Sequence, residues 1–226
     1  MHLYILRHAE SYSNVQGKIM STTDLPLTER GIRQAEATKT YLRKLAASET
    51  FHHVFSSPLI RAQQTAAVVC ENENSIYICK NLREMDLGKL EGLTWAERNN
   101  SYPQINVENL LTNAIIPEGE SFDDIRCRCN SFINEHLIQK TKDEKILIVS
   151  HGITIRVLIN SLLGKPDHCV NYINWADNAA VSEIECSPDG SALIRLNDRT
   201  HLVDSCLGTP NYDTWGMFAS IDYITA

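Results

Sequence analysis

Short apolar runs alternate with amphipathic stretches along most of the chain, which is the pattern of an α/β protein. The apolar runs are rich in Ile, Val, Leu and Tyr and end at polar or turn-forming residues, as buried strands do. They predict four strands, at residues 2–6, 54–57, 76–79 and 145–150. Because helical patterns separate these runs, we expect the strands to lie mainly parallel in one sheet.

The amphipathic stretches predict helices that begin at recognisable capping residues. Thr28 is a suitable N-cap for a helix to about residue 46, with Leu27 and Ile32 placed as a hydrophobic staple. Ser121 and Asp124 form a capping-box pattern. Further elements are predicted as helices from Pro58 to about residue 72, over 122–136 and over 152–163, and as a hairpin over 181–186 and 192–196.

Residues 93–120 follow neither period and predict a small cap-like insertion over one end of the sheet. The predicted fold is therefore α/β, a three-layer sandwich whose mainly parallel central sheet is flanked by helices. We expect a single domain over residues 1–226 with a C-terminal tail at 203–226. The tail is aromatic, and it could either pack back on the body or be buried in a homodimer.

Composition and charge narrow the range of partners. The 226 residues carry a formal net charge of −7, which argues against a nucleic-acid partner because such a partner requires a basic face. No apolar run reaches roughly 18 residues and the N-terminus lacks signal-peptide features, so we expect no membrane partner and a cytoplasmic location. The seven cysteines are an odd number and are expected to be reduced thiols.

Polar residues suited to catalysis follow the predicted strands at the points where the strands end. Arg7 and His8 follow the first strand, Arg61 the second, Glu84 the third and His151 the fourth. Because the carboxyl ends of parallel strands meet at one edge of a sheet, these side chains are expected to share one cleft. The insertion at 93–120 would then cover the active-site edge.

This set of residues suits phosphoryl transfer without a metal or cofactor. Arg7 and Arg61 can each offer a planar fork of donors to the phosphoryl oxygens. A neutral imidazole at His8 is a competent nucleophile, and the adjacent guanidinium should hold its pKa down. His151 would be a further donor to the phosphoryl oxygens. The implied partner is a small phosphorylated substrate.

Glu84 is the carboxylic acid placed to protonate the leaving oxygen and later to accept a proton from the attacking water. Glu10, Asp86 and Glu91 lie close in sequence and remain alternatives. The sequence contains no Gly-x-Gly-x-x-Gly motif, no Gly-x-Ser-x-Gly elbow and no P-loop. A metal site built on the histidines is disfavoured, because two arginines in the pocket would oppose a divalent cation.

Five blocks carry a family resemblance, and they are Arg7–Asn14, Asp24–Gly31, Ser56–Ala66, Leu82–Gly92 and Val149–Gly152. In this order they resemble the histidine phosphatase superfamily, in the branch that includes the cofactor-dependent phosphoglycerate mutases. With the first strand they span residues 3–152, about two thirds of the chain. The resemblance implies the same α/β fold and an enzyme that acts on phosphorylated small molecules.

The resemblance also implies roles for individual residues. His8 would become phosphorylated and Glu84 would be the proton donor. The phosphate would be held by Arg7, Asn14, Arg61 and His151, with Ser11 and Ser21 near the substrate. Ala9 stands where the family usually has Gly, and it would be strained by about 1 kcal/mol if the backbone there required a positive φ.

Two departures favour a phosphatase over a mutase. The chain lacks the long basic insertion that mutases carry after the acid block, and Ile153 stands where mutases tend to have Asn. The predicted enzyme is thus a phosphomonoesterase, a phosphoric monoester hydrolase that works through phosphohistidine. A cofactor-dependent phosphoglycerate mutase is the alternative. A phospho-ligand binding module without turnover is a third reading, and the paired histidines and arginines argue against it.

Overall fold

A computed structural model describes residues 1–47, 50–70, 75–105, 111–138, 141, 143–204 and 207. Six strands form one sheet, and they are β1 (His2–Arg7), β2 (His53–Ser56), β3 (Ile76–Ile78), β4 (Lys145–Ser150), β5 (Val181–Ser187) and β6 (Gly190–Asp198). The helices are α1 (Glu29–Leu45), α2 (Ile60–Val69), α3 (Trp95–Ser101), α5 (Phe122–His136), α6 (Gly152–Leu162) and α7 (Thr200–Asp204). Short 3-10 turns lie at η1 (Asn14–Gln16), η3 (Lys80–Leu82), η4 (Gly88–Leu90) and η5 (Asp167–Tyr172).

The sheet is mixed and mostly parallel, with the strand order β3-β2-β4-β1-β5-β6. β1 and β4 are parallel neighbours, with Arg7 beside Ser150 at their ends. β2 is parallel to both β3 and β4, whereas β5 is antiparallel to β1. The carboxyl ends of the first four strands therefore lie at one edge of the sheet, and β5 begins at that same edge. The prediction of a mainly parallel α/β sheet is confirmed.

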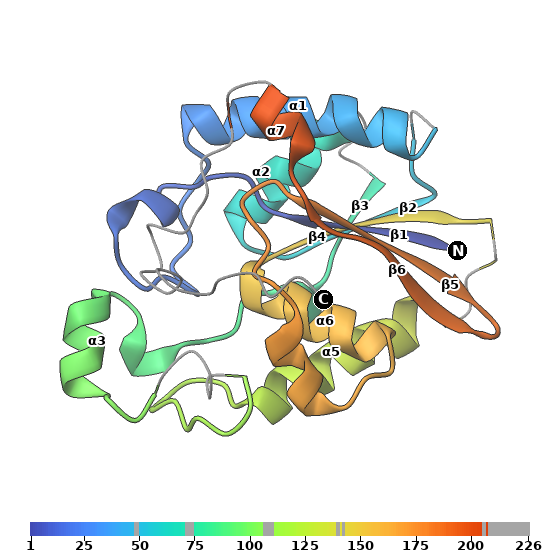
Figure 1. Cartoon of the computed structure of the whole chain (residues 1–226). Helices are drawn as coiled ribbons and strands as arrows, with labels where there is room; N and C mark the ends of the chain where they lie inside the picture. The colour runs from blue at the N-terminus through green and yellow to red at the C-terminus, as the bar shows by residue number, and fades with distance from the viewer. Residues whose placement is uncertain are drawn as a thin grey trace, which may run out of the picture.

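Helices cover both faces of the sheet, which makes three layers. In Figure 1, α1, α2 and α7 lie on one face, and α5 and α6 lie on the other. Successive side chains of a strand point to opposite faces of the sheet, so each strand packs against both helical layers. In β1, Leu3 and Ile5 join the core under α5 and α6, whereas Tyr4 and Leu6 join the core under α1 and α2.

Local capping explains where the helices begin. The Thr28 hydroxyl accepts a hydrogen bond from the Gly31 amide at 3.0 Å, so the predicted N-cap of α1 is present. The capping box of Ser121 and Asp124 also forms, and the predicted helix over 122–136 is confirmed. The sequence pattern also predicts Ile32 on the apolar face of α1, and this is wrong, because the side chain is 44% exposed and is not among the buried residues of the helix. The staple between Leu27 and Ile32 stays a prediction.

Helix α2 begins later than predicted from Pro58. Its first residue is Ile60, whose amide donates to Asp24 Oδ1 at 2.6 Å. A side chain from a distant loop therefore supplies the N-terminal acceptor, and the helix ends at Val69 rather than near residue 72.

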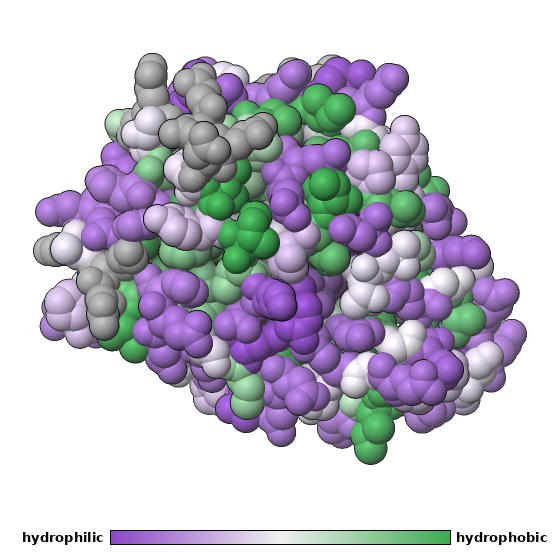
Figure 2. Space-filling model, turned by 180° about the vertical axis from the view of Figure 1, so that it is seen from behind, coloured by the Kyte–Doolittle hydropathy of each residue, from purple (hydrophilic) through white to green (hydrophobic). Residues whose placement is uncertain are grey.

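Helix α3, in the segment 93–120, lies beyond the end of β1 (Figure 1), and Leu111 and Ile116 of the same segment belong to the core cluster of α5 and α6. Residues 106–110 of this segment, and nearly all of the predicted tail, are outside the described residues. In the described part of the chain, no helix is both long and apolar enough to cross a membrane. The face seen in Figure 2 is mostly polar, with hydrophobic residues in separate patches.

Candidate active site

His8 directly follows β1, and its backbone amide donates to the Ser150 carbonyl at 2.9 Å. The imidazole is 3% exposed, with Nδ1 2.7 Å from the Ala9 carbonyl oxygen. Because a carbonyl oxygen can only accept, Nδ1 must carry the proton in this contact. The lone pair of the neutral ring is therefore on Nε2. An electron pair is therefore available on Nε2 of His8 and not on Nδ1.

The surroundings keep the His8 imidazole neutral. Burial lowers its pKa well below the usual value, and the charges of Arg61 and Arg7 lower it further, while the hydrogen bond to Ala9 opposes them. His151 lies beside it, with ring centroids 5.0 Å apart. Burial, Arg61 and the neighbouring His8 lower the pKa of His151 in the same way. Both rings are therefore neutral at physiological pH.

His151 is the N-cap residue of α6 and is fully buried. Its Nε2 lies 2.7 Å from the Ser57 hydroxyl, which also accepts from the Leu59 amide at 3.2 Å. Since that amide uses an acceptor position of the hydroxyl, the Ser57 proton is free to point at Nε2. Nδ1 of His151 then carries the single N–H proton of the neutral ring, and it has no hydrogen-bond partner among the described residues.

Arg7 is the last residue of β1 and is 4% exposed. Its Nη1 donates to the Ala176 carbonyl at 2.6 Å, whereas its buried Nε has no partner in the described part of the chain. Burial lowers the pKa of Arg7 to about 10, against the opposing charges of Glu84 and Asp177. A guanidinium at that pKa remains charged at neutral pH, so Arg7 presents a buried cation with an unused donor beside His8.

Arg61 lies in the first turn of α2 and is 2% exposed. Its Nη2 donates to the Ser21 carbonyl at 2.6 Å and its Nη1 to the Thr23 carbonyl at 3.0 Å. Burial lowers the pKa of Arg61, and Glu84 is the largest opposing charge. The loop that carries Ser21 and Thr23 therefore fixes the plane of this guanidinium.

Glu84 is 7% exposed and lies against the first turn of α6. Oε1 accepts from the Met85 amide at 2.9 Å and from the Thr154 amide at 3.2 Å, while the Thr154 hydroxyl donates to the Arg83 carbonyl at 2.6 Å. Oε2 accepts one hydrogen bond, from the Ile153 amide at 3.2 Å. Oε2 is therefore the oxygen with capacity for a proton. Glu84 is also the largest attractive charge on both Arg7 and Arg61, so it belongs to the same cluster.

The other carboxylates that the sequence left open each bind groups outside the cluster of histidines and arginines or support its loops. Glu10 accepts from the Thr28 hydroxyl at 2.7 Å and pairs with Arg30 at 3.2 Å. Glu91 binds the loop of residues 21–23 through five hydrogen bonds. Asp86 accepts from the Gly88 amide at 2.9 Å in the next turn of its own segment.

Asn14 is oriented by three donors on its side-chain oxygen. Oδ1 accepts from the Ser11 amide and hydroxyl, each at 2.9 Å, and from Asn178 Nδ2 at 3.2 Å. The amide group of Asn14 is therefore set with Nδ2 as the outward donor. Asn178 Nδ2 also donates to the His8 carbonyl at 3.0 Å, which links Asn14 to His8.

Ser11 and Ser21 are fully buried and contact Asn14 and Arg61, respectively. The Ser11 hydroxyl donates to Asn14, and the Ser21 hydroxyl donates to Glu91 at 3.0 Å. Their role as substrate-binding residues stays a prediction, whereas their support of Asn14 and Arg61 is direct. Ala9 is fully buried and has a negative φ, so the replacement of Gly at this position causes no backbone strain.

The structure brings together Arg7, His8, Arg61, Glu84, Asn14 and His151. Sequence reasoning missed Ser57 and Asn178, which contact His151 and His8 respectively. Ser57 lies inside a recognised block, but its partner is 94 positions away in the chain. Asn178 lies outside every block, so no motif indicated it. No group of three or more His, Cys, Asp and Glu side chains in the described residues is arranged to hold a metal ion.

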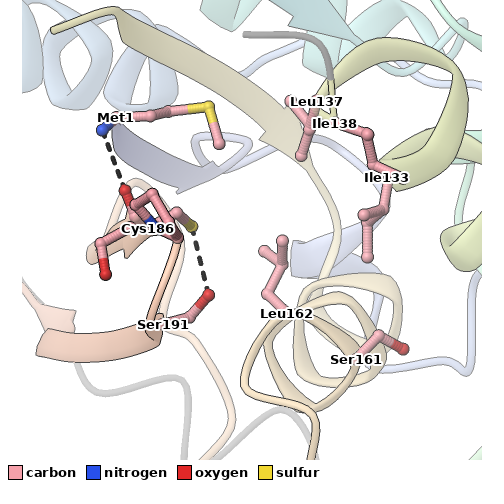
Figure 3. Close-up of a pocket in the computed structure, with 10 residues that line it drawn as sticks. Met1, Ile133, Leu137, Ile138, Ser161, Leu162, Cys186 and Ser191 are labelled. Carbon is pink, nitrogen blue, oxygen red and sulfur yellow. Dashed lines mark hydrogen bonds between the residues drawn. The ribbon is translucent and has the colours of Figure 1, made fainter. Parts of the chain in front are cut away.

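A separate cavity of about 350 Å³ lies near the start of β1, at the opposite end of the sheet. Figure 3 shows Met1, Ile133 and Leu162 around it, with Cys186 and Ser191 on the hairpin side. The Ser191 hydroxyl lies 3.4 Å from Cys186 Sγ. None of the residues of the candidate active site lines this cavity.

Known proteins match this chain over most of its length. The family model of the histidine phosphatase superfamily (branch 1) matches residues 3–199. A probable phosphoglycerate mutase, GpmB, of Yersinia pestis (strain Pestoides F) is 33% identical over 191 residues, covering 82% of this chain and 85% of that protein. The chain therefore belongs to branch 1 of the histidine phosphatase superfamily.

Solved structures of phosphatases share the fold. The alpha-ribazole phosphatase of Shigella flexneri has a TM-score of 0.74 and 30% identity, covering 88% of this chain and 96% of that one. A mycobacterial glucosyl-3-phosphoglycerate phosphatase, solved in complex with VO3, has a TM-score of 0.77 and 26% identity, covering 88% and 99%. The relatives therefore comprise phosphatases of small metabolites as well as a probable mutase.

Proposed function

We propose that this protein is a phosphomonoesterase that hydrolyses a small phosphorylated metabolite through a phosphohistidine on His8, without a metal ion. The observation that carries this proposal is the state of the His8 ring. Nδ1 is bound to the Ala9 carbonyl, Nε2 holds the lone pair, and burial beside Arg7 and Arg61 keeps the ring unprotonated. A buried neutral imidazole between two guanidinium groups is suited to attack a phosphate.

In the first step, Nε2 of His8 attacks phosphorus and the bond from phosphorus to the ester oxygen breaks. Glu84 gives its proton, from Oε2, to the leaving oxygen. In the second step, water attacks the phosphohistidine, Glu84 takes the proton from that water, and the P–N bond breaks. The ring nitrogen regains its lone pair, and inorganic phosphate leaves.

The unused buried donors support the binding of the phosphoryl group. Nε of Arg7 and Nδ1 of His151 are both buried without a partner among the described residues, which is costly unless a ligand accepts from them. Nδ2 of Asn14 and the guanidinium of Arg61 complete the proposed binding set. Charge that develops on the phosphoryl oxygens would be stabilised by groups that are already in place.

The sequence favours hydrolysis over isomerisation. The chain continues after Gly92 without the mutase insertion, so water is the expected acceptor of the phosphoryl group. The named activities of the Shigella and mycobacterial relatives point to sugar- and nucleoside-like phosphomonoesters as substrates. The probable mutase from Yersinia pestis supports a phosphoglycerate mutase as the second candidate.

The test is release of phosphate by the purified protein in excess chelator, first from an aryl phosphate and then from alpha-ribazole phosphate, glucosyl-3-phosphoglycerate and 3-phosphoglycerate. His8→Ala should abolish both turnover and incorporation of labelled phosphate. His136→Ala is the matched control, because His136 lies at the end of α5 and contacts no residue of the cluster. Labelling that persists in His8→Ala would assign the nucleophile to another residue.

Three outcomes would change the assignment. Isomerisation of 3-phosphoglycerate that needs a bisphosphate primer and exceeds hydrolysis would identify a mutase. Activity lost in chelator and restored by a divalent cation would overturn the metal-free mechanism. A wild-type protein that binds phosphate but releases none from any ester would support a binding module instead.

A further inference from the structure

Residues 175–178, which we call the 175–178 segment, connect η5 to β5 at the active-site edge. The segment contacts the candidate site at two points. The Ala176 carbonyl accepts from Arg7 Nη1 at 2.6 Å. Asn178 Nδ2 donates to the His8 carbonyl and to Asn14 Oδ1, at 3.0 and 3.2 Å. The position of this segment therefore sets the orientation of a guanidinium, the backbone of the nucleophile and an amide donor.

A single side chain from β6, that of Asn197, binds this segment through two hydrogen bonds, which we call the bracket. Asn197 Nδ2 donates to the Trp175 carbonyl at 2.9 Å, and Asn197 Oδ1 accepts from the Asp177 amide at 2.7 Å. These two groups flank Ala176, so the bracket fixes the peptide whose carbonyl holds Arg7. The Asn197 amide itself donates to the Ser182 hydroxyl at 3.0 Å, which anchors the bracket to β5.

The backbone is irregular where Asn197 lies. Asn197 has a φ of 52°, a left-handed conformation that Asn adopts more readily than most residues with a side chain. The ladder between β5 and β6 is also irregular here, because Val181 pairs with Asp198 while Glu183 pairs with Arg195. β6 therefore carries one extra residue, and such bulges re-aim side chains near functional sites.

We propose that Asn197 is a positioning residue for the reaction, acting through the 175–178 segment on Arg7 and His8. This inference rests on the proposed function of those two residues. Asn197 does not touch the substrate. It holds the Ala176 carbonyl where Arg7 Nη1 can donate to it, so that the remaining donors of the guanidinium keep one direction. It also holds Asn178 against the His8 carbonyl.

The expected consequence is a loss of turnover rather than of affinity for the ground state. The transition state carries more charge on the phosphoryl oxygens than the bound substrate does, so it depends more on hydrogen-bond donors that are already in place. Donors that must reorient during the reaction stabilise this charge less. Without the bracket, kcat for an aryl phosphate should fall about 10- to 100-fold while KM changes less than about threefold. The affinity for vanadate, which mimics the transferring phosphoryl group, should weaken by about tenfold or more.

Asn197→Gly is the primary variant, because Gly accepts the left-handed conformation and removes both bracket bonds. Asn197→Asp keeps the acceptor for the Asp177 amide but loses the donor to Trp175, so its kcat should lie between those of the Gly variant and the wild type. Tyr41→Phe is the control, since it removes a 2.6 Å hydrogen bond to Asp198, the next residue of β6, without touching the segment. It should keep the wild-type kcat.

The outcomes separate this inference from the proposed function. If the wild type turns over substrate and Asn197→Gly is folded, an unchanged kcat and vanadate affinity overturn the positioning role. An equal loss in Tyr41→Phe overturns it as well, since the effect would then be general loosening of β6. If Asn197→Gly does not fold, the kcat and vanadate affinity of Asn197→Asp test the positioning role instead, and wild-type values overturn it. If the wild type has no turnover, the proposed function fails, and vanadate binding alone tests the bracket.

Discussion

Glu91 gives the sharpest test of how the structure holds Arg61. Its carboxylate accepts from the amides of Ser21, Thr22 and Thr23 and from two hydroxyls, at 2.6 to 3.3 Å. The carbonyls of Ser21 and Thr23 in turn accept from Arg61. Glu91→Gln keeps the shape of the side chain but leaves one acceptor oxygen where there were two. The loop should loosen, and Arg61 should lose its fixed plane.

The pKa of Glu91 gives the magnitude of its contribution to stability. Burial raises this pKa, but the hydrogen bonds from Thr22, Thr23 and Ser21 outweigh burial and lower the pKa from 4.5 to about 2. A shift of that size corresponds to roughly 3 kcal/mol between the two protonation states. Because the carboxylate is partly exposed, solvent screening reduces its contribution to folding to about 1–2 kcal/mol.

The direction of this pKa shift determines how the stability changes with pH. A carboxyl group whose pKa is lower in the folded state contributes stability that is fully present above its unfolded pKa. The contribution is lost as the pH falls from about 4.5 through 2. Glu91→Gln should therefore lower the free energy of unfolding by about 1–2 kcal/mol at pH 7. The difference from the wild type should shrink steadily below pH 4.5.

Two measurements test this reasoning. Denaturant unfolding at a series of pH values gives the stability difference, and aryl phosphate hydrolysis at pH 7 gives kcat, which should fall about 10-fold or more because Arg61 is misplaced. Asp124→Asn is the matched control, since Asp124 is another carboxylate with a lowered pKa but caps α5 instead. A wild-type kcat for Glu91→Gln, together with a free energy of unfolding that followed that of the wild type at every pH, including below 4.5, would refute the argument.

Three further predictions follow from the same structure. The lowered pKa of His8 keeps its nucleophilic form present below pH 6.5, so kcat/KM for an aryl phosphate should hold through that pH; a limb with a midpoint near 6.5 would contradict the neutral ring. Gly31→Ala should destabilise the fold by about 3 kcal/mol in denaturant unfolding, because the added Cβ would lie 1.9 Å from the Glu10 carbonyl oxygen. Gly17→Ala, which meets only open space at a φ of +67°, should cost about 1 kcal/mol, and equal losses would show that the contact is not the cause. Glu84→Gln should slow alkyl phosphates at least about tenfold more than aryl phosphates, whose leaving groups need no proton; equal slowing would assign the acid to another residue.

The elements whose signals are local were predicted well. The strand at 145–150 and the helix at 122–136 were placed at their observed bounds, because an apolar run and a capping box need no distant partner. Where distant groups intervene, the prediction failed. Gly31 approaches the main chain of Glu10, which directs Ile32, about 100° further round α1, toward solvent. Asp24 sets the start of α2 from another loop.

The candidate site divides in the same way. The order of strands and helices was enough to predict that His8, Arg61, Glu84 and His151 converge, because the ends of parallel strands share an edge. The groups that orient them were not predictable. Ser57, Asn178 and Glu91 act through contacts with residues 68 to 170 positions away, and nothing near them in sequence indicates these partners.

The sequence by itself thus determined the α/β class, the family and the set of polar side chains that meet around His8. These follow from periodicity and from residue types at strand ends, which are properties of short stretches of chain. Only the tertiary structure decided which nitrogen of His8 carries the lone pair, which oxygen of Glu84 is open, and that Asn197 brackets the support of Arg7. Each of these depends on angstrom-scale contacts between segments that folding alone brings together.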